Sequence, residues 1–307
     1  MIDPAGGSWY VESLTEQLGQ AAWSMFQELE SHGGMSGSLK AEIPQSQIHT
    51  LLQTRTNNLA KRKDVLVGTN MYVNRGENPL VPDEIDYRQL HTDRAQFILE
   101  RRDESQNCVK NLQSGSSIHD LVNAAKEGAT LEQMGQATSA GNNDHPIIVP
   151  LRATRLSEPF EQLRHHANSF EAQHGHAPQI FLATMGIVAQ HKARADFSTG
   201  FFEVGGFELL RHEGQGYATP DEAVQAALES GAGALVICAT DAMYQDIVSP
   251  LTKQIKEAKP DMVVVLAGYP KEQIDAYRSA GVDAFIHVRA DCYAENMMLQ
   301  EKLGVWS

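Results

Sequence analysis

The feature that most constrains the fold is a regular alternation of short apolar segments with longer amphipathic ones, which starts at residue 178. Short apolar runs bounded by turn residues are typical of buried strands, and the segments between them have helical length. The expected strands are 180–184, 207–210, 234–239, 262–267 and 284–288, and the expected helices are 191–204, 220–230, 242–258, 271–279 and 291–303. Five consecutive strand–helix units predict a parallel sheet covered on both faces, and such sheets bind ligands at the carboxyl ends of their strands.

The first 138 residues lack this alternation and are expected to be mainly helical. The longest predicted helix covers residues 9–31, with Ser8 at its N-cap and a stop at Gly33 and Gly34. Its apolar residues recur every three or four positions and so share one face: Val11, Leu14, Leu18, Ala22, Met25, Phe26 and Leu29. Further helices are expected at 44–62, 85–102, 118–126 and 131–136, and a short strand at 65–69.

The domain organisation follows from a polar, glycine-containing stretch at residues 139–144, which is the predicted linker. A length of 307 residues is typical of about two domains. We therefore expect a helical segment at 1–138, a linker and connecting helix at 139–177, and an α/β domain at 178–307.

Composition excludes several classes of protein. The formal net charge is −14 and no long Lys/Arg cluster is present, so nucleic-acid binding is not expected. No apolar stretch reaches the roughly 20 residues that span a bilayer, and no signal-peptide pattern is present. We therefore expect no membrane partner and a cytoplasmic location. The three cysteines, Cys108, Cys238 and Cys292, fit neither a disulfide framework nor a zinc site, and Cys238 is expected to be a small buried apolar residue.

Two stretches of sequence carry a family resemblance. Residues 3–12 read Asp-Pro-Ala-Gly-Gly-Ser-Trp-Tyr-Val-Glu, and residues 194–207 read Arg-Ala-Asp-Phe-Ser-Thr-Gly-Phe-Phe-Glu-Val-Gly-Gly-Phe. The first resembles a segment near the end of the catalytic (β/α)8 barrel of methylmalonyl-CoA mutases. The second is similar to the small, non-catalytic (beta) subunit of the heterodimeric enzymes. With the strand–helix series, the resemblance covers nearly the whole chain. It implies a flavodoxin-like, cobalamin-binding-like domain preceded by the end of a barrel region.

The resemblance also implies a function. The family interconverts methylmalonyl-CoA and succinyl-CoA, an isomerase reaction that starts from adenosylcobalamin. Most of the barrel, with its acyl-CoA channel, lies upstream of the segment matched by residues 3–12. We therefore expect this chain to be the C-terminal region of a small subunit, or a separately encoded remnant of one, and to be inactive alone. The implied partner is the large, catalytic mutase subunit, and the implied role of this chain is structural.

The first cofactor motif of the family is only partly present. After the first strand the family has Asp-x-His-x-x-Gly, whose His ligates cobalt, and the matching positions here are Ala189, His191 and Arg194. A metal-bound imidazole usually has its second ring nitrogen held by a carboxylate, which Ala189 cannot supply. Arg194 places a long side chain where the family's glycine allows close approach of the corrin. His191 is the candidate cobalt ligand, and the alternative is a loop or helix-start histidine with no ligand.

The other two cofactor contacts are altered as well. The family's Ser-x-Leu motif after the third strand becomes Ala239-Thr240-Asp241, in which Thr240 keeps a hydroxyl but Asp241 introduces a charge. Its Gly-Gly pair after the fourth strand becomes Gly268-Tyr269, so one glycine remains and a bulky ring follows.

Together, the three altered motifs favour a degenerate site that no longer binds adenosylcobalamin. The residues that remain for cofactor binding are His191, Thr240 and Gly268. One alternative is a cobalamin-binding module with His191 as the lower cobalt ligand. A free-standing isomerase is a third hypothesis, which the missing barrel disfavours.

Two other groups of residues are interpreted as structural. Gly205-Gly206 and the glycines at 231 and 233 lack the context of a phosphate-binding loop and are expected to form turns. The four histidines at 165, 166, 174 and 176 have no recognised metal-ligand spacing and are expected at a solvated helix end.

Overall fold

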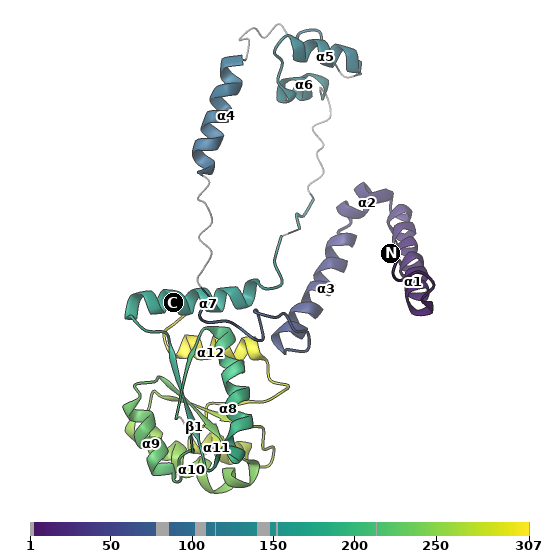
Figure 1. The fold of residues 1–307 in the computed structure, drawn as a ribbon. Helices are drawn as coiled ribbons and strands as arrows, with labels where there is room; N and C mark the ends of the chain where they lie inside the picture. The colour runs from purple at the N-terminus through teal and green to yellow at the C-terminus, as the bar shows by residue number, and fades with distance from the viewer. Residues whose placement is uncertain are drawn as a thin grey trace. The chain divides into compact units, whose positions relative to one another are not determined.

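The computed structural model describes residues 3–77, 86–101, 109–113, 115–139, 148–151, 153–212 and 214–306 (Figure 1). The chain divides into two compact units. The helical unit comprises Met1–Ile43 and Asn78–Pro150, and the α/β unit comprises Pro44–Glu77 and Leu151–Ser307.

Among the described residues of the helical unit, helices are the only regular secondary structure. They are α1 (Trp9–Ser31), α2 (Gly34–Lys40), α4 (Tyr87–Arg101), α5 (Ile118–Lys126) and α6 (Leu131–Thr138). Helix α1 has the predicted bounds, whereas α2 was not predicted. Gly33 adopts a φ of 86°, which reverses the chain, and the buried Ser38 donates its hydroxyl to the Leu29 carbonyl at 3.1 Å. Helices α5 and α6 each begin with a capping box, at Ser117 and Thr130.

Helix α1 has an apolar face but buries none of its residues. Leu18 on that face is 61% exposed, and Phe26 and Trp23 stack on each other at 5.3 Å. Ser8 occupies the predicted N-cap position but its side chain makes no capping hydrogen bond. The Glu12 carboxylate instead accepts from the Gly7 N–H at 3.2 Å.

The α/β unit is built on a five-stranded sheet, as predicted. Its strands are β1 (Gln179–Thr184), β2 (Glu208–Arg211), β3 (Ala234–Cys238), β4 (Val263–Ala267) and β5 (Ala284–Ile286). All neighbours pair in parallel, in the order β2-β1-β3-β4-β5, which is the flavodoxin-like arrangement. Every residue of β3, β4 and β5 is buried, which explains their continuous apolar sequence.

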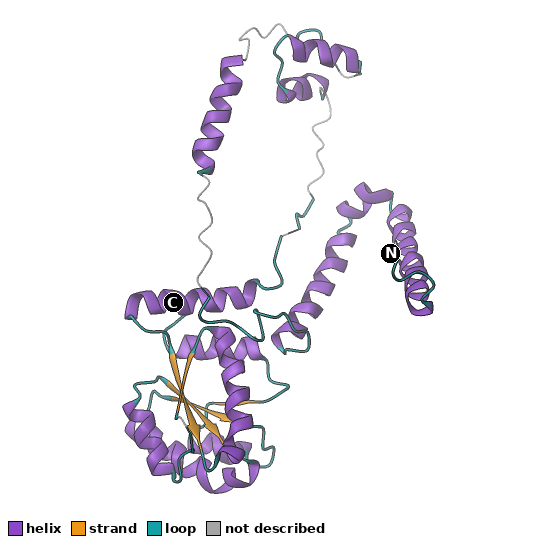
Figure 2. Ribbon diagram, viewed as in Figure 1, coloured by secondary structure: helices purple, strands orange, loops and turns teal. Residues whose placement is uncertain are grey.

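Helices cover both faces of this sheet (Figure 2). Alternate residues of β1 divide between two apolar cores: Phe181 and Ala183 lie in one, Ile180 and Leu182 in the other. Residues of α9 (Pro220–Glu229), α10 (Asp241–Ala258) and α11 (Ile274–Ala280) line the first core. The second core receives residues of α3 (Ile43–Ala60), α7 (Glu158–His174), α8 (Val188–Phe202), the 3-10 turn η2 (Glu203–Gly205) and α12 (Cys292–Lys302).

Both cysteines of this unit are buried in the second core or beside it. Cys238 and Cys292 are fully buried free thiols, and burial raises the pKa of each to about 12. Neither thiol is therefore ionised near neutral pH, and the prediction that Cys238 is a buried apolar residue is confirmed.

The strand predicted at 65–69 is wrong. Val67 makes only an isolated bridge with Met71, and Gly68 takes a φ of 76°. The Leu66 N–H of this segment donates to the buried Asn70 side chain at 2.8 Å, and that side chain also donates to the carbonyls of Leu59 and Asp64 at 2.9 and 2.8 Å.

The predicted domain boundaries remain a prediction. Residues 140–144 of the expected linker, and the expected ends of α4 at 85 and 102, lie outside the described residues. Helix α7, expected as a connecting helix, places Phe160 and Leu163 in the second core. Among the described residues, no helix combines the length and the apolar character needed to cross a bilayer.

Candidate functional site

The sequence-predicted site residues lie at one edge of the sheet. His191 lies in the second turn of α8, which follows β1, Thr240 is the N-cap of α10 after β3, and Gly268 directly follows β4. Because β1, β3 and β4 are parallel neighbours, their carboxyl ends meet at the same edge. The structure therefore brings the three positions together at the edge where such sheets bind ligands.

His191 is a packed helical residue. Helix α8 begins at Val188, three residues earlier than predicted, so His191 lies within it, and the side chain is 6% exposed. The loop after β2 covers it: the Gly216 N–H donates to the Gly186 carbonyl at 3.0 Å, and a Cβ on Gly216 would lie 2.8 Å from His191 Nδ1. That nitrogen has no hydrogen-bond partner in the part of the chain that the structure describes. No carboxylate of the described residues is hydrogen-bonded to that nitrogen.

Arg194 extends from α8 across the ends of β3 and β4. Its Nη2 donates to Asp241 Oδ1 at 2.7 Å, and its Nη1 donates to the Ala267 carbonyl. The guanidinium carbon also lies 5.5 Å from the centre of the Tyr244 ring. Two of the residues that depart from the family pattern, Arg194 and Asp241, thus form an ion pair with each other.

Gly268 is adjacent to this guanidinium. A Cβ on Gly268 would collide with Arg194 Nη1 and would lie 3.1 Å from Tyr244 Cε2. The space beside the glycine is therefore filled by the protein's own side chains.

Tyr244 also packs against Arg194 at the ends of β3 and β4, and it was not predicted from the sequence as a site residue. Its hydroxyl donates to the Ala267 carbonyl at 2.7 Å and accepts from the Ala239 N–H at 3.3 Å. Burial raises the pKa of Tyr244 well above its usual range, so the hydroxyl remains a neutral donor that links β3 to β4. Its position in α10, one turn after a strand end, was the only available sequence signal.

Tyr269 lies beside a small cavity of about 390 Å³ at the ends of β4 and β5. Its ring centre is 4.6 Å from that of His287 and 6.3 Å from that of Phe285. Burial lowers the pKa of His287, with a further contribution from the charge of Arg289, so this ring packs as a neutral imidazole at pH 7.

Thr240, the remaining predicted site residue, is the N-cap of α10, but its side chain makes no capping hydrogen bond.

This arrangement does not fit a bound cobalamin. A lower ligand would have to reach out from the edge, but His191 lies beneath Gly216. A nucleotide tail would need room beside the ends of β3 and β4, and Arg194 occupies it.

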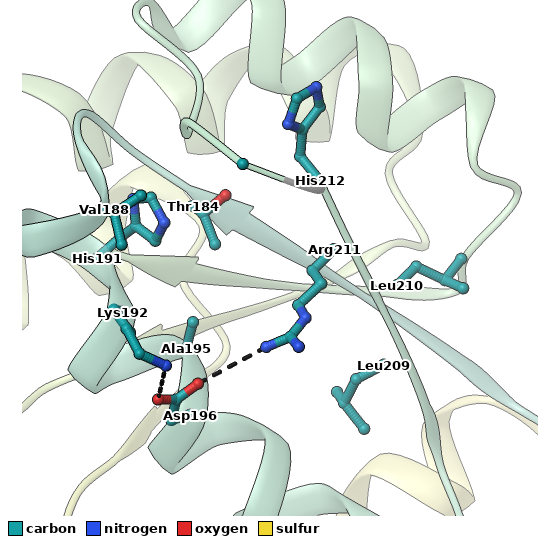
Figure 3. Close-up of a pocket in the computed structure, with 11 residues that line it drawn as sticks. Thr184, Val188, His191, Lys192, Ala195, Asp196, Leu209, Leu210, Arg211 and His212 are labelled. Atoms are coloured by element: carbon teal, nitrogen blue, oxygen red, sulfur yellow. Dashed lines mark hydrogen bonds and ion pairs between the residues drawn. The ribbon is translucent and has the colours of Figure 1, made fainter.

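A larger and more polar cavity, of about 590 Å³, lies at the β1–β2 side of the same edge (Figure 3). Among the described residues, three charged side chains line it: Lys192 and Asp196 from α8, and Arg211 from the end of β2. The sequence did not single out these residues. The spacing of Lys192 and Asp196, four residues apart on a helix, and the position of Arg211 at a strand end were signals that could have found them.

The four histidines near α7 are separate from this edge of the sheet in sequence and make ring contacts of their own. His166 stacks on Trp306 at 4.2 Å, and His174 stacks on Phe170 at 4.0 Å. Over the residues that the structure describes, no group of three or more His, Cys, Asp or Glu side chains is placed to hold a metal ion.

Comparison with known proteins finds similarity to one group of enzymes. The methylmalonyl-CoA mutase family model matches residues 1–143. A methylmalonyl-CoA mutase of Cereibacter sphaeroides is 26% identical over 302 residues, covering 92% of this chain and 42% of the relative. The methylmalonyl-CoA mutase small subunit of Porphyromonas gingivalis is 25% identical over 99% of this chain and 40% of its own length. The large subunit of the same organism is 26% identical over 92% of this chain and 42% of its own length.

The chain thus spans about two fifths of the length of these relatives. The family model matches the helical N-terminal part, the relatives align through the α/β unit as well, and the sheet has the flavodoxin-like order. The chain is therefore similar to methylmalonyl-CoA mutases over most of its length.

Proposed function

We propose that this chain is the small-subunit part of an adenosylcobalamin-dependent methylmalonyl-CoA mutase, and that it supports a large catalytic subunit without holding cofactor itself. Small and large mutase subunits of one organism both align with this chain, which supports a two-subunit assembly. The observation that carries the non-catalytic role is the Arg194–Asp241 ion pair beside Gly268.

Opening this region would break several interactions at once. A ligand entering beside Gly268 would have to displace Arg194 from Asp241, from the Ala267 carbonyl and from the Tyr244 ring. Asp241 is 73% exposed, so the ion pair itself contributes only about 0.2–1 kcal/mol. The Arg194 side chain is 29% exposed, and its hydrogen bond to the Ala267 carbonyl and its contact with the Tyr244 ring add to this. The closed state is therefore stabilised relative to a state with room for a cofactor tail.

Helix α1 supports the proposal of a protein partner. Its apolar face is exposed over several turns, with Leu14, Leu18 and Phe26 each more than two-fifths exposed. A contiguous exposed apolar face of this kind is typical of a protein–protein contact. In the proposed assembly this face is covered by barrel elements that the described residues do not contain.

The first experiment measures binding of hydroxocobalamin by visible absorbance that co-elutes with the protein on gel filtration. We expect no co-eluting colour for the wild type or for His191→Ala. Stoichiometric colour in the wild type that is lost in His191→Ala would contradict the degenerate site and support the cobalamin-binding module.

A paired variant tests the blocking role of Arg194 directly. Arg194→Gly with Asp241→Leu removes the ion pair and restores the family residue types at both positions. If wild type and variant both retain a folded circular dichroism spectrum, higher hydroxocobalamin affinity in the variant supports the block. Binding by the wild type as tight as by the variant would contradict it.

The partner is tested by co-expression with the large mutase subunit of the same organism. We expect a stable complex at micromolar concentration that is lost in the double variant Leu18→Asp/Phe26→Asp. The matched control, Gln20→Asp/Gln27→Asp, adds the same charge away from the apolar face of α1 and should still form the complex. No complex with the wild type would count heavily against the proposal.

A further inference from the structure

The cavity between α8 and β2 has the charge of an anion site. Asp196 accepts a hydrogen bond from Lys192 Nζ at 2.6 Å and lies 3.6 Å from Arg211 Nη1. Two cations therefore share one carboxylate, and the charged side chains among the described lining residues carry a net positive charge. In Figure 3 the Arg211 side chain extends from the end of β2 toward Asp196 on α8.

Arg211 retains unused hydrogen-bonding capacity. Its side chain is 58% exposed, and across the described ranges its guanidinium makes an ion pair with Asp196 but no hydrogen bond. Burial raises the pKa of Glu203, and the charges of Arg75 and Arg211 oppose this rise. Glu203 is not among the residues that line the cavity. A guanidinium in this state can present two parallel N–H donors to an oxyanion.

One buried polar group gives an independent indication of a ligand. Thr184 is 2% exposed and lines the cavity, and its hydroxyl has no hydrogen-bond partner among the described residues. His191 lines the same cavity, but its unpaired Nδ1 lies against Gly216 and carries no part of the argument. Buried polar atoms are usually paired in folded proteins, so the Thr184 hydroxyl beside the cavity points to an external partner.

We propose that this cavity binds a small phosphate monoester, with the phosphate between Arg211 and Lys192. The two cations approach from different elements, β2 and α8, which suits a group with three oxygens better than a planar carboxylate. A volume of about 590 Å³ exceeds that of a phosphate ion and is ordinary for a metabolite.

The remaining lining residues accommodate the organic part of the ligand. One wall is apolar and consists of Val188, Ala195, Leu209 and Leu210. Thr184 can donate to a ligand oxygen, and Asp196 can accept from a ligand hydroxyl. These properties favour a short polyol phosphate, and the assignment does not depend on the mutase role.

The test is isothermal titration calorimetry of the full chain with glycerol 3-phosphate at low ionic strength. We expect saturable one-to-one binding, weakened about tenfold by Arg211→Gln and several-fold by Lys192→Gln, because each variant loses a charge-assisted hydrogen bond. The matched control is Lys253→Gln on α10, whose helix packs on the opposite face of the sheet and which should bind as the wild type does. Arg211→Lys keeps the positive charge but loses the paired N–H donors of the guanidinium, so this variant should bind glycerol 3-phosphate with intermediate affinity.

Several outcomes would overturn the assignment. They are the absence of saturable binding by the wild type up to about 10 mM, equal affinity of Arg211→Gln and wild type, and succinate binding as tightly as glycerol 3-phosphate. Circular dichroism of each variant separates loss of binding from loss of fold. Displacement of glycerol 3-phosphate by hydroxocobalamin would also count against a separate site, whereas the result of the cobalamin experiment alone would not.

Discussion

Helix α1 and the central sheet both have a clear apolar pattern, but most apolar residues of the sheet are buried and most of those of α1 are exposed. Leu182 in β1 is fully buried between α8 and its neighbours, whereas Leu18 in α1 is 61% exposed. The two segments are equally readable in the sequence, since α1 and all five strands were predicted. The difference teaches that periodicity identifies an element and its apolar face, but it does not say whether a partner for that face lies in the same chain.

The largest expected effect tests this difference directly. Leu182→Ala should lower the free energy of unfolding by about 2–5 kcal/mol, because it leaves a cavity in a closed core. Leu18→Ala removes the same atoms from an exposed position and should change stability by no more than about 0.5 kcal/mol. Urea denaturation of the isolated chain measures both. A comparable loss for Leu18→Ala would show that α1 is buried in solution.

A smaller effect concerns Asp283, a partly buried carboxylate of the α/β unit. Burial would raise the pKa of Asp283, but hydrogen bonds from Lys256 Nζ, Lys302 Nζ and the Val264 N–H, at 2.8, 2.8 and 2.9 Å, hold it below its usual value. Because the pKa is lower in the folded state, the ionised Asp283 carboxylate stabilises the fold above about pH 4. This stabilisation is lost as the pH falls through the folded pKa. Asp283→Asn should therefore cost about 1–3 kcal/mol at pH 7 and much less near pH 2.

The measurement is urea denaturation of wild type and Asp283→Asn across this pH range. The matched variant on α1 is Glu16→Gln. Among the described residues this carboxylate accepts only from the exposed Gln20 side chain, at 2.8 Å, and its loss should matter little at either pH. A constant difference between wild type and Asp283→Asn from pH 7 to pH 2 would show that the carboxylate is not the stabilising group.

The smallest expected effect compares helix caps in the two regions. The Thr219 hydroxyl accepts from the Glu222 N–H at 3.3 Å at the start of α9, so Thr219→Ala should cost about 1 kcal/mol. Ser8 occupies the same position in α1 without a capping bond, and Ser8→Ala should be nearly neutral. The measurement is the thermal unfolding midpoint of Thr219→Ala and of Ser8→Ala. An equal decrease in the midpoint for the two variants would show that the caps of α9 and α1 contribute equally.

The elements with a strong local pattern could be predicted, and the exceptions have physical causes. The bounds of α1 and α5 match the predictions, because turn residues and caps end their periodic patterns clearly. Helix α2 was missed because the glycines at 33, 34 and 37 disfavour a helix by propensity, while the buried Ser38 holds it by a contact with Leu29. Residues 65–69 resemble a strand in composition, but the Leu66 N–H donates to the Asn70 side chain and not to a neighbouring strand.

The sequence by itself determined the parallel sheet, the edge at which a site could lie and the altered state of the motifs around His191, Thr240 and Gly268. Only the tertiary structure decided that Arg194 and Asp241, 47 residues apart, pair with each other beside Gly268. It also placed Arg211 opposite Lys192 and Asp196. The physical reason is that periodicity and capping arise from neighbours a few residues apart. Contacts across the carboxyl edge depend on strand order, which brings the ends of separate strands together.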